Sequence, residues 1–187
     1  MKQLVVIDCQ NDFITGSLAC ENAQEAVDYI VELLKAHPET DVFYTLDWHS
    51  PNHMSFKKNG GIWPDHCVQH SPGARLSEAF QQLPPAQQPH IGNMFYKGAN
   101  DNLEEYSGVQ AKNQEGIVLK DYLKPGAYIA GIASEYCVKE TVFELLDTVE
   151  LKVLEPGLGY VSLDTHQQAL AAYQEKDLLV HHVDSLV

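Results

Sequence analysis

The stretch Leu4-Val5-Val6-Ile7-Asp8 decides the fold class, because four consecutive apolar residues end abruptly in a carboxylate. A short apolar run of this kind is typical of a buried strand. Residues Ala23–Ala36 follow, with apolar side chains spaced to cover one face of a helix. A strand followed by a helix is the unit from which parallel sheets are built, so this segment indicates an α/β protein.

The same alternation continues along the chain. Further strands are predicted at Val42–Leu46, Asn93–Tyr96, Gly126–Ile132, Leu151–Leu154 and Leu178–Val183. Further helices are predicted at Gly73–Gln82, Gln114–Leu123, Glu135–Asp147 and Leu163–Lys176. Residues 48–71 carry neither pattern, and irregular segments of that length in compact domains are usually functional or disordered; the Trp and His content favours function. We therefore predict one α/β domain over residues 1–187, with a mostly parallel sheet.

The charge of the chain argues against two classes of partner. With 12 lysines and arginines against 26 aspartates and glutamates, the formal net charge is −14, so the basic surface that nucleic acids and anionic membranes require is missing. The N-terminal apolar run is too short for a signal peptide, and no stretch approaches the ~20 apolar residues of a membrane span. We therefore expect a cytoplasmic protein whose four cysteines are free thiols.

Four chemically active side chains follow four of the predicted strands. Asp8 follows the first strand and Asp47 the second. Lys97 follows the third, and Cys137 lies just beyond the fourth. In open parallel sheets, ligands bind outside the carboxyl ends of the strands. We therefore expect these side chains to meet at one edge of the sheet, although they are distant in sequence.

Cys137 is the candidate nucleophile of this group. It stands where a predicted strand passes into a helical pattern, and a helix N-terminus lowers the pKa of a thiol and offers N–H groups to an oxyanion. Lys97 would stabilise the thiolate, and Asp8 would transfer protons to and from the thiol and the leaving amine. The segment alone leaves a second interpretation open, in which Cys137 is a buried structural thiol.

The irregular segment holds candidate metal ligands. Asp47, His49 and His66 provide one carboxylate and two imidazoles, with His53 as a candidate fourth ligand. This donor set suits one divalent transition metal, zinc first, with iron or manganese as alternatives. Cys67, beside His66, is expected to pack rather than to bind. The remaining histidines are expected at the surface without a role: His37, His90, His166, His181 and His182.

Five segments together resemble the nicotinamidase/pyrazinamidase branch of the isochorismatase-like cysteine hydrolases. They are Val6-Ile7-Asp8-Cys9-Gln10-Asn11-Asp12-Phe13, Thr45–Phe56, Trp63–Gln69, Phe95-Tyr96-Lys97-Gly98 and Gly131–Val138, in the order of that family. The resemblance implies a doubly wound sheet with helices on both faces. Two positions depart from the family pattern: His70 stands where Gly is common, and Tyr136 where His is frequent.

The resemblance also implies roles for particular residues. Asp8, Lys97 and Cys137 would form the catalytic triad, and Asp47, His49 and His66 the metal site. A cis peptide bond would precede Ala133, whose N–H group would form the oxyanion hole together with that of Cys137. The aromatic residues at substrate-packing positions are Phe13, Trp63, Tyr106 and Tyr136.

The function implied is that of a nicotinamidase, which hydrolyses nicotinamide to nicotinate and ammonia through a cysteine thioester in NAD salvage. The metal motif favours this activity, because in the family it separates nicotinamidases from isochorismatase and carbamoyl-amidase relatives. Three alternatives stay open: another amidase or isochorismatase-like hydrolase, a hydrolase using metal-bound water beside a structural Cys137, and a non-catalytic binding protein. The oligomeric state, including a homo-oligomer, is also open.

Overall fold

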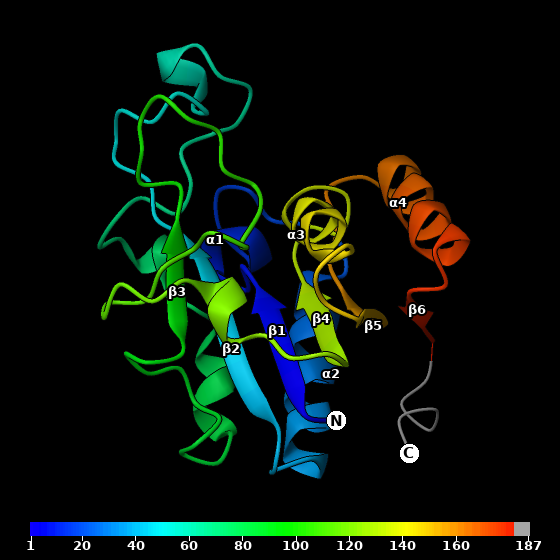
Figure 1. The fold of residues 1–187 in the computed structure, drawn as a ribbon. Coiled ribbons are helices and arrows are strands. Elements are labelled where there is room, and N and C mark those ends of the chain that lie inside the picture. The colour runs from blue at the N-terminus through cyan, green and yellow to red at the C-terminus, as the bar shows by residue number, and fades with distance from the viewer. Residues whose placement is uncertain (182–187) are drawn as a thin grey trace.

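The computed structural model describes residues 1–181. Within them, parallel strands form one sheet in the order β3-β2-β1-β4-β5-β6. The strands are β1 (Gln3–Ile7), β2 (Asp41–Asp47), β3 (Met94–Lys97), β4 (Ala127–Gly131), β5 (Leu151–Leu158) and β6 (Leu179–Val180). The chain runs outward from β1 to β3, returns to the centre at β4 and runs outward to β6 (Figure 1). The predicted doubly wound sheet is therefore confirmed.

Helices cover both faces of the sheet. They are α1 (Asn11–Ile14), α2 (Ala23–Ala36), α3 (Cys137–Leu145) and α4 (Leu163–Glu175). Side chains alternate along β1, so that Leu4 and Val6 pack in one core cluster with α2, while Val5 and Ile7 pack in the other with α3 and α4. Figure 1 shows α2 and α3 on opposite sides of the strands. Both layers of the core are thus set by a single strand.

The prediction of a single helix at Gly73–Gln82 is wrong, because the middle of this segment is not helical. Two 3₁₀ turns form instead, at Pro72–Ala74 and Glu78–Gln82. Between them the chain is extended, and Arg75 and Ser77 pair through their backbones with the segment that follows β1. The Ser77 hydroxyl accepts a hydrogen bond from the Ala79 N–H and starts the second turn. Tertiary pairing with the β1 exit therefore overrides the helical pattern.

The helix predicted at Gln114–Leu123 is also largely absent. The Asn113 carboxamide accepts hydrogen bonds from the N–H groups of Glu115 and Ile117, and Gly116 has a φ of +81°. These features close a turn, after which Val118 pairs with Lys112 in an antiparallel bridge. Only Leu119–Tyr122 is helical, as a 3₁₀ turn.

The other predicted elements are present with shifted ends. The helix predicted at Glu135–Asp147 begins at Cys137, and the strand predicted at Leu151–Leu154 continues to Leu158. The last predicted strand extends beyond the described residues, where His182 also lies. Among residues 1–181, none of the helices combines the length and apolar composition needed to cross a bilayer.

Candidate active site

The four strand-end residues meet as predicted. The Nζ atom of Lys97, the last residue of β3, lies 2.8 Å from Oδ2 of Asp8 and 2.5 Å from Oδ1 of Asp47. The same Nζ atom lies 3.5 Å from Sγ of Cys137. All four side chains are almost completely buried. One ammonium group therefore links the thiol to two carboxylates beyond the carboxyl ends of β1, β2 and β3.

The charges of this group are set by their mutual contacts. Burial alone would lower the pKa of Lys97, but Asp47 and Asp8 outweigh it, so its pKa lies well above its usual value. Burial alone would raise the pKa of Asp47, but Lys97 and the contacts with His49 and His66 hold it well below its usual value. Lys97 is thus an ammonium and Asp47 a carboxylate at neutral pH.

The thiol of Cys137 differs from the sequence expectation. Burial raises its pKa well above the usual value, and Asp8 and Asp47 add to this against the opposing effect of Lys97. The expected lowering of the pKa by the helix N-terminus and Lys97 does not prevail, because burial of the thiol, together with two carboxylates in the same space, outweighs it. A thiol in this environment needs a neighbouring base to take its proton.

Asp8 is placed to be that base. Its Oδ1 atom accepts a hydrogen bond of 2.5 Å from the Thr45 hydroxyl. Its Oδ2 atom forms the ion pair with Lys97 but lacks a hydrogen bond of good geometry to any described residue. Burial also raises the pKa of Asp8, despite Lys97. A carboxylate whose pKa is raised in this way can accept and return a proton.

The backbone before the thiol presents two free donors. The peptide bond between Ile132 and Ala133 is cis, as the resemblance implied, and α3 begins at Cys137 itself. The N–H groups of Ala133 and Cys137 donate to no other residue of the described chain. Free N–H groups at a helix start are suited to bind a developing oxyanion.

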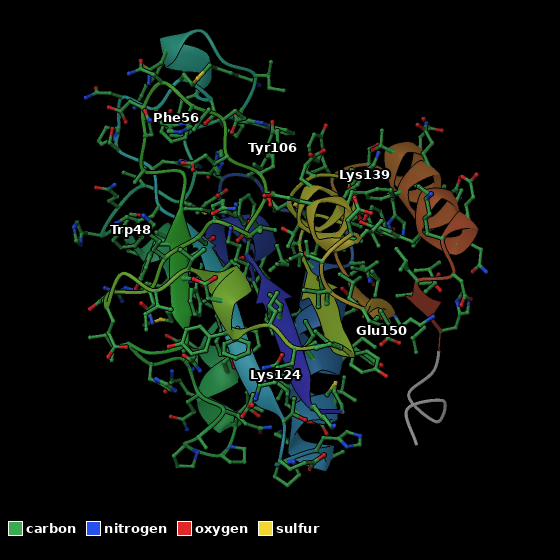
Figure 2. The ribbon with its side chains drawn as sticks, viewed as in Figure 1. Trp48, Phe56, Tyr106, Lys124, Lys139 and Glu150 are labelled. Atoms are coloured by element: carbon green, nitrogen blue, oxygen red, sulfur yellow. The ribbon has the colours of Figure 1, made fainter. Side chains whose placement is uncertain are left out.

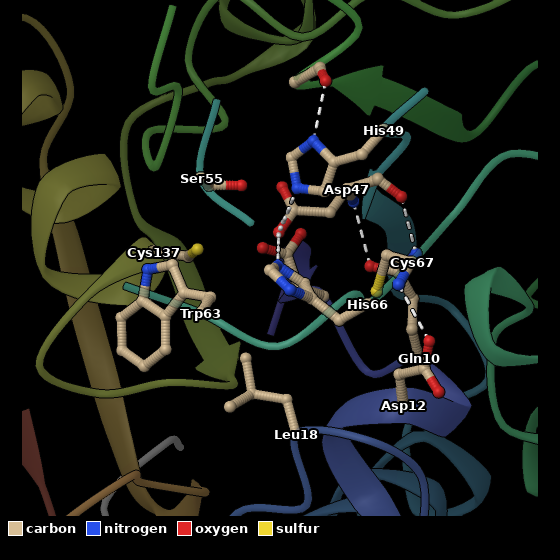
Figure 3. Close-up of polar contacts among 12 residues, drawn as sticks. Gln10, Asp12, Leu18, Asp47, His49, Ser55, Trp63, His66, Cys67 and Cys137 are labelled. Carbon is tan, nitrogen blue, oxygen red and sulfur yellow. Dashed lines mark hydrogen bonds and ion pairs between the residues drawn. The ribbon is translucent and has the colours of Figure 1, made fainter. Parts of the chain in front are cut away.

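The candidate metal ligands converge beside this group. Oδ2 of Asp47 lies 3.5 Å from Nε2 of His49 and 3.9 Å from Nε2 of His66, and the three ligand atoms lie within 4.8 Å of one another. In Figure 3 the two imidazoles and the carboxylate point toward one another. The donors match the one-carboxylate, two-imidazole set that divalent transition metals bind.

Hydrogen bonds at the far side of each ring leave the Nε2 atoms free. Nδ1 of His49 lies 2.7 Å from the Gly98 carbonyl, and Nδ1 of His66 lies 2.8 Å from the Pro64 carbonyl. A carbonyl only accepts, so each Nδ1 carries a proton, and Nε2 is the nitrogen of each ring that faces Asp47 and could bind a metal. Burial lowers the pKa of His66, which favours the neutral ring that a metal needs, whereas contact with Asp47 raises the pKa of His49 despite its burial.

His53 does not join these ligands. Its Nε2 atom lies 3.1 Å from the Leu103 carbonyl, and its Nδ1 atom lies 2.7 Å from the Ser55 hydroxyl. Both ring nitrogens are therefore engaged within the protein, and the ring packs against His49 in a tilted arrangement, at a centroid distance of 4.1 Å and an interplanar angle of 39°. The prediction of a fourth ligand is corrected: His53 supports the His49 ring.

Two polar residues that fix the ligands were not singled out from the sequence. The Gln10 carboxamide donates to the Asp47 carbonyl at 2.8 Å and accepts from the Asp47 N–H at 2.9 Å. The Asp12 carboxylate accepts from the Cys67 N–H at 2.8 Å and so holds the segment that carries His66. Figure 3 shows both contacts. Their signal in the sequence is their place beside Asp8 in the Val6–Phe13 segment that carries the family resemblance.

Gly98 is a third missed residue. Its φ is +71°, and a Cβ atom there would lie 2.5 Å from Cε1 of His49. Its N–H donates to the Glu105 carboxylate at 3.1 Å, while its carbonyl accepts from His49. Only glycine fits the turn that follows Lys97 and leaves space for the His49 ring.

An aromatic pocket opens beside the thiol. Phe13, Trp63, Tyr106 and Tyr136 all line it, together with Cys137, Asp47, His66 and Ala133. Trp63 and Tyr136 meet edge-on at 5.1 Å, and the Trp63 indole donates to the Tyr106 hydroxyl at 3.0 Å. Tyr106 and Phe56 lie on the segments that rise beyond the carboxyl end of β3 (Figure 2). The four predicted aromatic positions therefore share one pocket.

The remaining predictions on histidine and cysteine have mixed outcomes. His90 and His181 are exposed and His37 is half-buried, but His166 is 9% exposed, so its predicted surface position is wrong. Cys67 is buried in a core cluster and stands outside the metal group, and the cysteines are free thiols, as expected. His70 has a φ of +65°, the conformation that glycine would adopt most readily.

Comparison with known proteins defines the class of this chain. Residues 2–182 match the isochorismatase domain. The chain therefore belongs to the isochorismatase domain family, in the branch that contains nicotinamidases and pyrazinamidases.

Individual relatives agree with this placement over nearly the whole chain. It is 30% identical to the nicotinamidase of Escherichia coli (strain K12), which it matches over 91% of its own length and 88% of that protein. It is 31% identical to the nicotinamidase/pyrazinamidase of Mycobacterium tuberculosis, over 91% and 92%. The crystal structure of the pyrazinamidase of Pyrococcus horikoshii in complex with zinc superposes with a TM-score of 0.82 at 28% identity, covering 97% of this chain and 99% of that one.

Proposed function

We propose that this chain is a nicotinamidase, an amidohydrolase that converts nicotinamide to nicotinate and ammonia through a thioester on Cys137. The observation that carries the proposal is the position of the Lys97 ammonium, within 2.8 Å of Asp8 and 3.5 Å of the Cys137 sulfur. The identity with nicotinamidases over most of the chain supports the carboxamide as the bond that is cleaved. Pyrazinamide is a second expected substrate.

The first half of the reaction forms the thioester. Asp8 takes the proton of the Cys137 thiol, and the sulfur attacks the carboxamide carbon, so that one C–S bond forms. The negative charge on the carbonyl oxygen is held by the N–H groups of Ala133 and Cys137. As the C–N bond breaks, Asp8 returns its proton to the nitrogen, and ammonia leaves. Lys97 stays protonated and balances the charge on Asp8 and the sulfur.

The second half restores the enzyme. Asp8 takes a proton from water, the resulting hydroxyl oxygen bonds to the thioester carbon, and the C–S bond breaks. The proton on Asp8 returns to the Cys137 sulfur, and nicotinic acid is released, which gives up its proton to water as nicotinate. The net change is one water consumed for one ammonia released.

Asp47, His49 and His66 would hold one divalent transition metal, for which we propose zinc. The relative from Pyrococcus horikoshii binds zinc, which supports this choice. When bound, the ion would supply a Lewis-acid site for the pyridine nitrogen and so fix the ring. The aromatic residues Phe13, Trp63, Tyr106 and Tyr136 would pack against the ring faces and edges.

The environment of Cys137 argues against two of the open alternatives. A purely structural thiol has no need of a pocket or of a buried ammonium at 3.5 Å. A non-catalytic binding protein has no need of Asp8 and Lys97 buried together, because burying charged groups costs stability. We further propose that the chain acts as one domain over residues 1–187, in the cytoplasm, within NAD salvage.

An ammonia-release assay with the purified protein tests this function. Ammonia release from nicotinamide and pyrazinamide is compared with that from an N-carbamoyl amine, and isochorismate, which contains no nitrogen, is followed by its disappearance, each at equal concentration. We expect turnover of the two aromatic carboxamides. Turnover of the N-carbamoyl amine or of isochorismate alone would assign the chain to another reaction of the same fold. Loss of turnover after thiol alkylation is expected, whereas a hydrolase using metal-bound water would retain it.

A further inference from the structure

A buried polar network outside the pocket holds the segment between the cis peptide bond and the thiol. Ser134 is completely buried, and its hydroxyl lies 2.6 Å from Nδ1 of His166 on α4. The same hydroxyl donates to Oε2 of Glu135 at 3.1 Å. The other carboxylate oxygen of Glu135 accepts from the N–H groups of Val161 and Ser162, at 2.7 Å and 3.0 Å. Consecutive residues before Cys137 are thus anchored to the start of α4.

The hydrogen positions in this network follow from its donors and acceptors. Glu135 accepts two backbone N–H groups and is a carboxylate, so the Ser134 hydroxyl must donate to it. The Ser134 oxygen then accepts from His166, which places a proton on Nδ1 of that ring. The ring itself stacks on Tyr160 at a centroid distance of 4.2 Å and an interplanar angle of 13°. His166 therefore acts as a fixed donor to Ser134.

A second residue of α4 holds the other end of Ser134. The hydroxyl of Tyr173 donates to the Ser134 carbonyl at 2.5 Å, and Tyr173 is completely buried. His166 and Tyr173 are seven residues apart, which places them on the same face of α4, two turns apart. The Ser134 N–H in turn donates to the Gly159 carbonyl at 2.9 Å. The side chain, carbonyl and N–H of Ser134 are all fixed by the second half of the chain.

We propose that His166 and Tyr173 are positioning residues, which fix the Ala133 and Cys137 N–H groups through Ser134 and Glu135. The inference rests on the proposed function and assigns to α4 a part in it. Ala133 precedes the anchored pair, and only Tyr136 separates the pair from Cys137, so a shift at Ser134 moves both donors. Oxyanion donors act through their placement relative to the transition state, and a displacement of about 1 Å can cost about 10²-fold in rate.

The test compares four variants in nicotinamide hydrolysis and in inhibition by pyridine-3-carbaldehyde. The aldehyde adds the Cys137 thiol across its C=O bond, so that a C–S bond forms and the oxygen meets the same two N–H groups. His166→Phe and Ser134→Ala remove the hydrogen bond between the His166 ring and the Ser134 hydroxyl. Tyr173→Phe removes the hydrogen bond from the Tyr173 hydroxyl to the Ser134 carbonyl. His166→Asn is the conservative variant, because its carboxamide can place an N–H near the position of Nδ1.

We expect kcat to fall by about tenfold or more in His166→Phe and Ser134→Ala, with KM within about twofold of the wild type. The aldehyde should bind more weakly by a similar factor, nicotinate should bind as before, and His166→Asn should restore most of kcat. Folded variants that keep both kcat and aldehyde affinity, or that change KM alone, would overturn the inference. If His166→Phe does not fold, Ser134→Ala and Tyr173→Phe decide, because each removes a single hydroxyl.

A failure of the proposed function would give a different experimental result from a failure of the positioning role. If the wild-type protein released no ammonia from nicotinamide, the proposed nicotinamidase function would be contradicted. Aldehyde addition uses the thiol, its base and the two N–H groups but breaks no carboxamide bond, so its dependence on Ser134 and His166 would still report on their positioning role.

Discussion

The Nζ atom of Lys97 lies 2.5 Å from Oδ1 of Asp47, whose other oxygen faces His49 and His66. The ammonium beside the proposed nucleophile therefore also contacts a proposed metal ligand. The two groups are a single buried electrostatic unit in which Lys97 is the central cation. A change at Lys97 should for this reason affect stability, metal retention and the thiol together.

Lys97→Met should destabilise the metal-free protein by about 3–5 kcal/mol, because it leaves the carboxyl groups of Asp8 and Asp47 buried without their cation. Urea unfolding of the metal-free protein measures the change. Lys58→Met is the control, since Lys58 pairs with Asp65 at the surface, where both side chains are nearly half exposed. The control should change stability by less than about 1 kcal/mol. Equal effects of the two substitutions would contradict the central place of Lys97.

Gly98→Ala should weaken metal binding. Its Cβ atom would lie 2.5 Å from the His49 ring, which must then move. Gly116→Ala is the matched control, because Gly116 also has a positive φ, +81°, but has no atom within 4 Å of the added carbon. Both variants should lose about 1–2 kcal/mol of stability from the backbone conformation, and Gly98→Ala alone should lower the metal content. The same metal content in both variants would show that the His49 ring tolerates the clash.

Metal retention should separate His49 and His66 from His53. Elemental analysis after dialysis is expected to find the metal lost from His49→Gln and His66→Gln, because each removes an Nε2 donor. His53→Gln should keep it, since both nitrogens of His53 already bind Ser55 and Leu103. Loss of the metal from His53→Gln together with normal retention in His66→Gln would reverse the assignment of the ligands.

Much of the fold follows from local pattern. The Leu4–Ile7 run places β1, and its alternating side chains supply the core on both faces. The strand-end positions of Asp8, Asp47, Lys97 and Cys137 are enough to predict their meeting, because parallel strands present their carboxyl ends at one edge. These features depend on short-range periodicity, which the sequence displays directly.

The predictions that proved wrong concern residues whose structure or pKa is determined by contacts with distant parts of the chain. The Gly73–Gln82 pattern is helical, but pairing of Arg75 and Ser77 with the β1 exit makes its middle extended. His166 lies on the buried face of α4 with Ala169 and Tyr173, but an imidazole is expected at the surface unless a partner is known, and its partners Ser134 and Tyr160 come from other parts of the fold. The thiol pKa of Cys137 depends on the burial of the sulfur and then on how closely two carboxylates approach, which no local pattern reveals.

His166 should make stability pH-dependent. Burial lowers its pKa below the usual 6.5, although Glu135 and Glu155 act in the opposite direction. The unfolded chain therefore takes up this proton first as the pH falls, so the contribution of neutral His166 is complete above about pH 6.5 and is lost as the pH falls through the folded pKa. Between about pH 7 and pH 5, the unfolding free energy of the wild type should decline more steeply than that of His166→Phe. Identical slopes would show that the ring titrates equally in both states.

The most direct test of the account compares ammonia release from nicotinamide by Cys137→Ala and Cys20→Ala. Cys20 is a matched control, because it is a free thiol that lines the same pocket. Cys137→Ala should release ammonia no faster than a blank without protein, while Cys20→Ala should keep turnover close to that of the wild type. Turnover by a folded Cys137→Ala protein would contradict the proposal that this sulfur attacks the carboxamide.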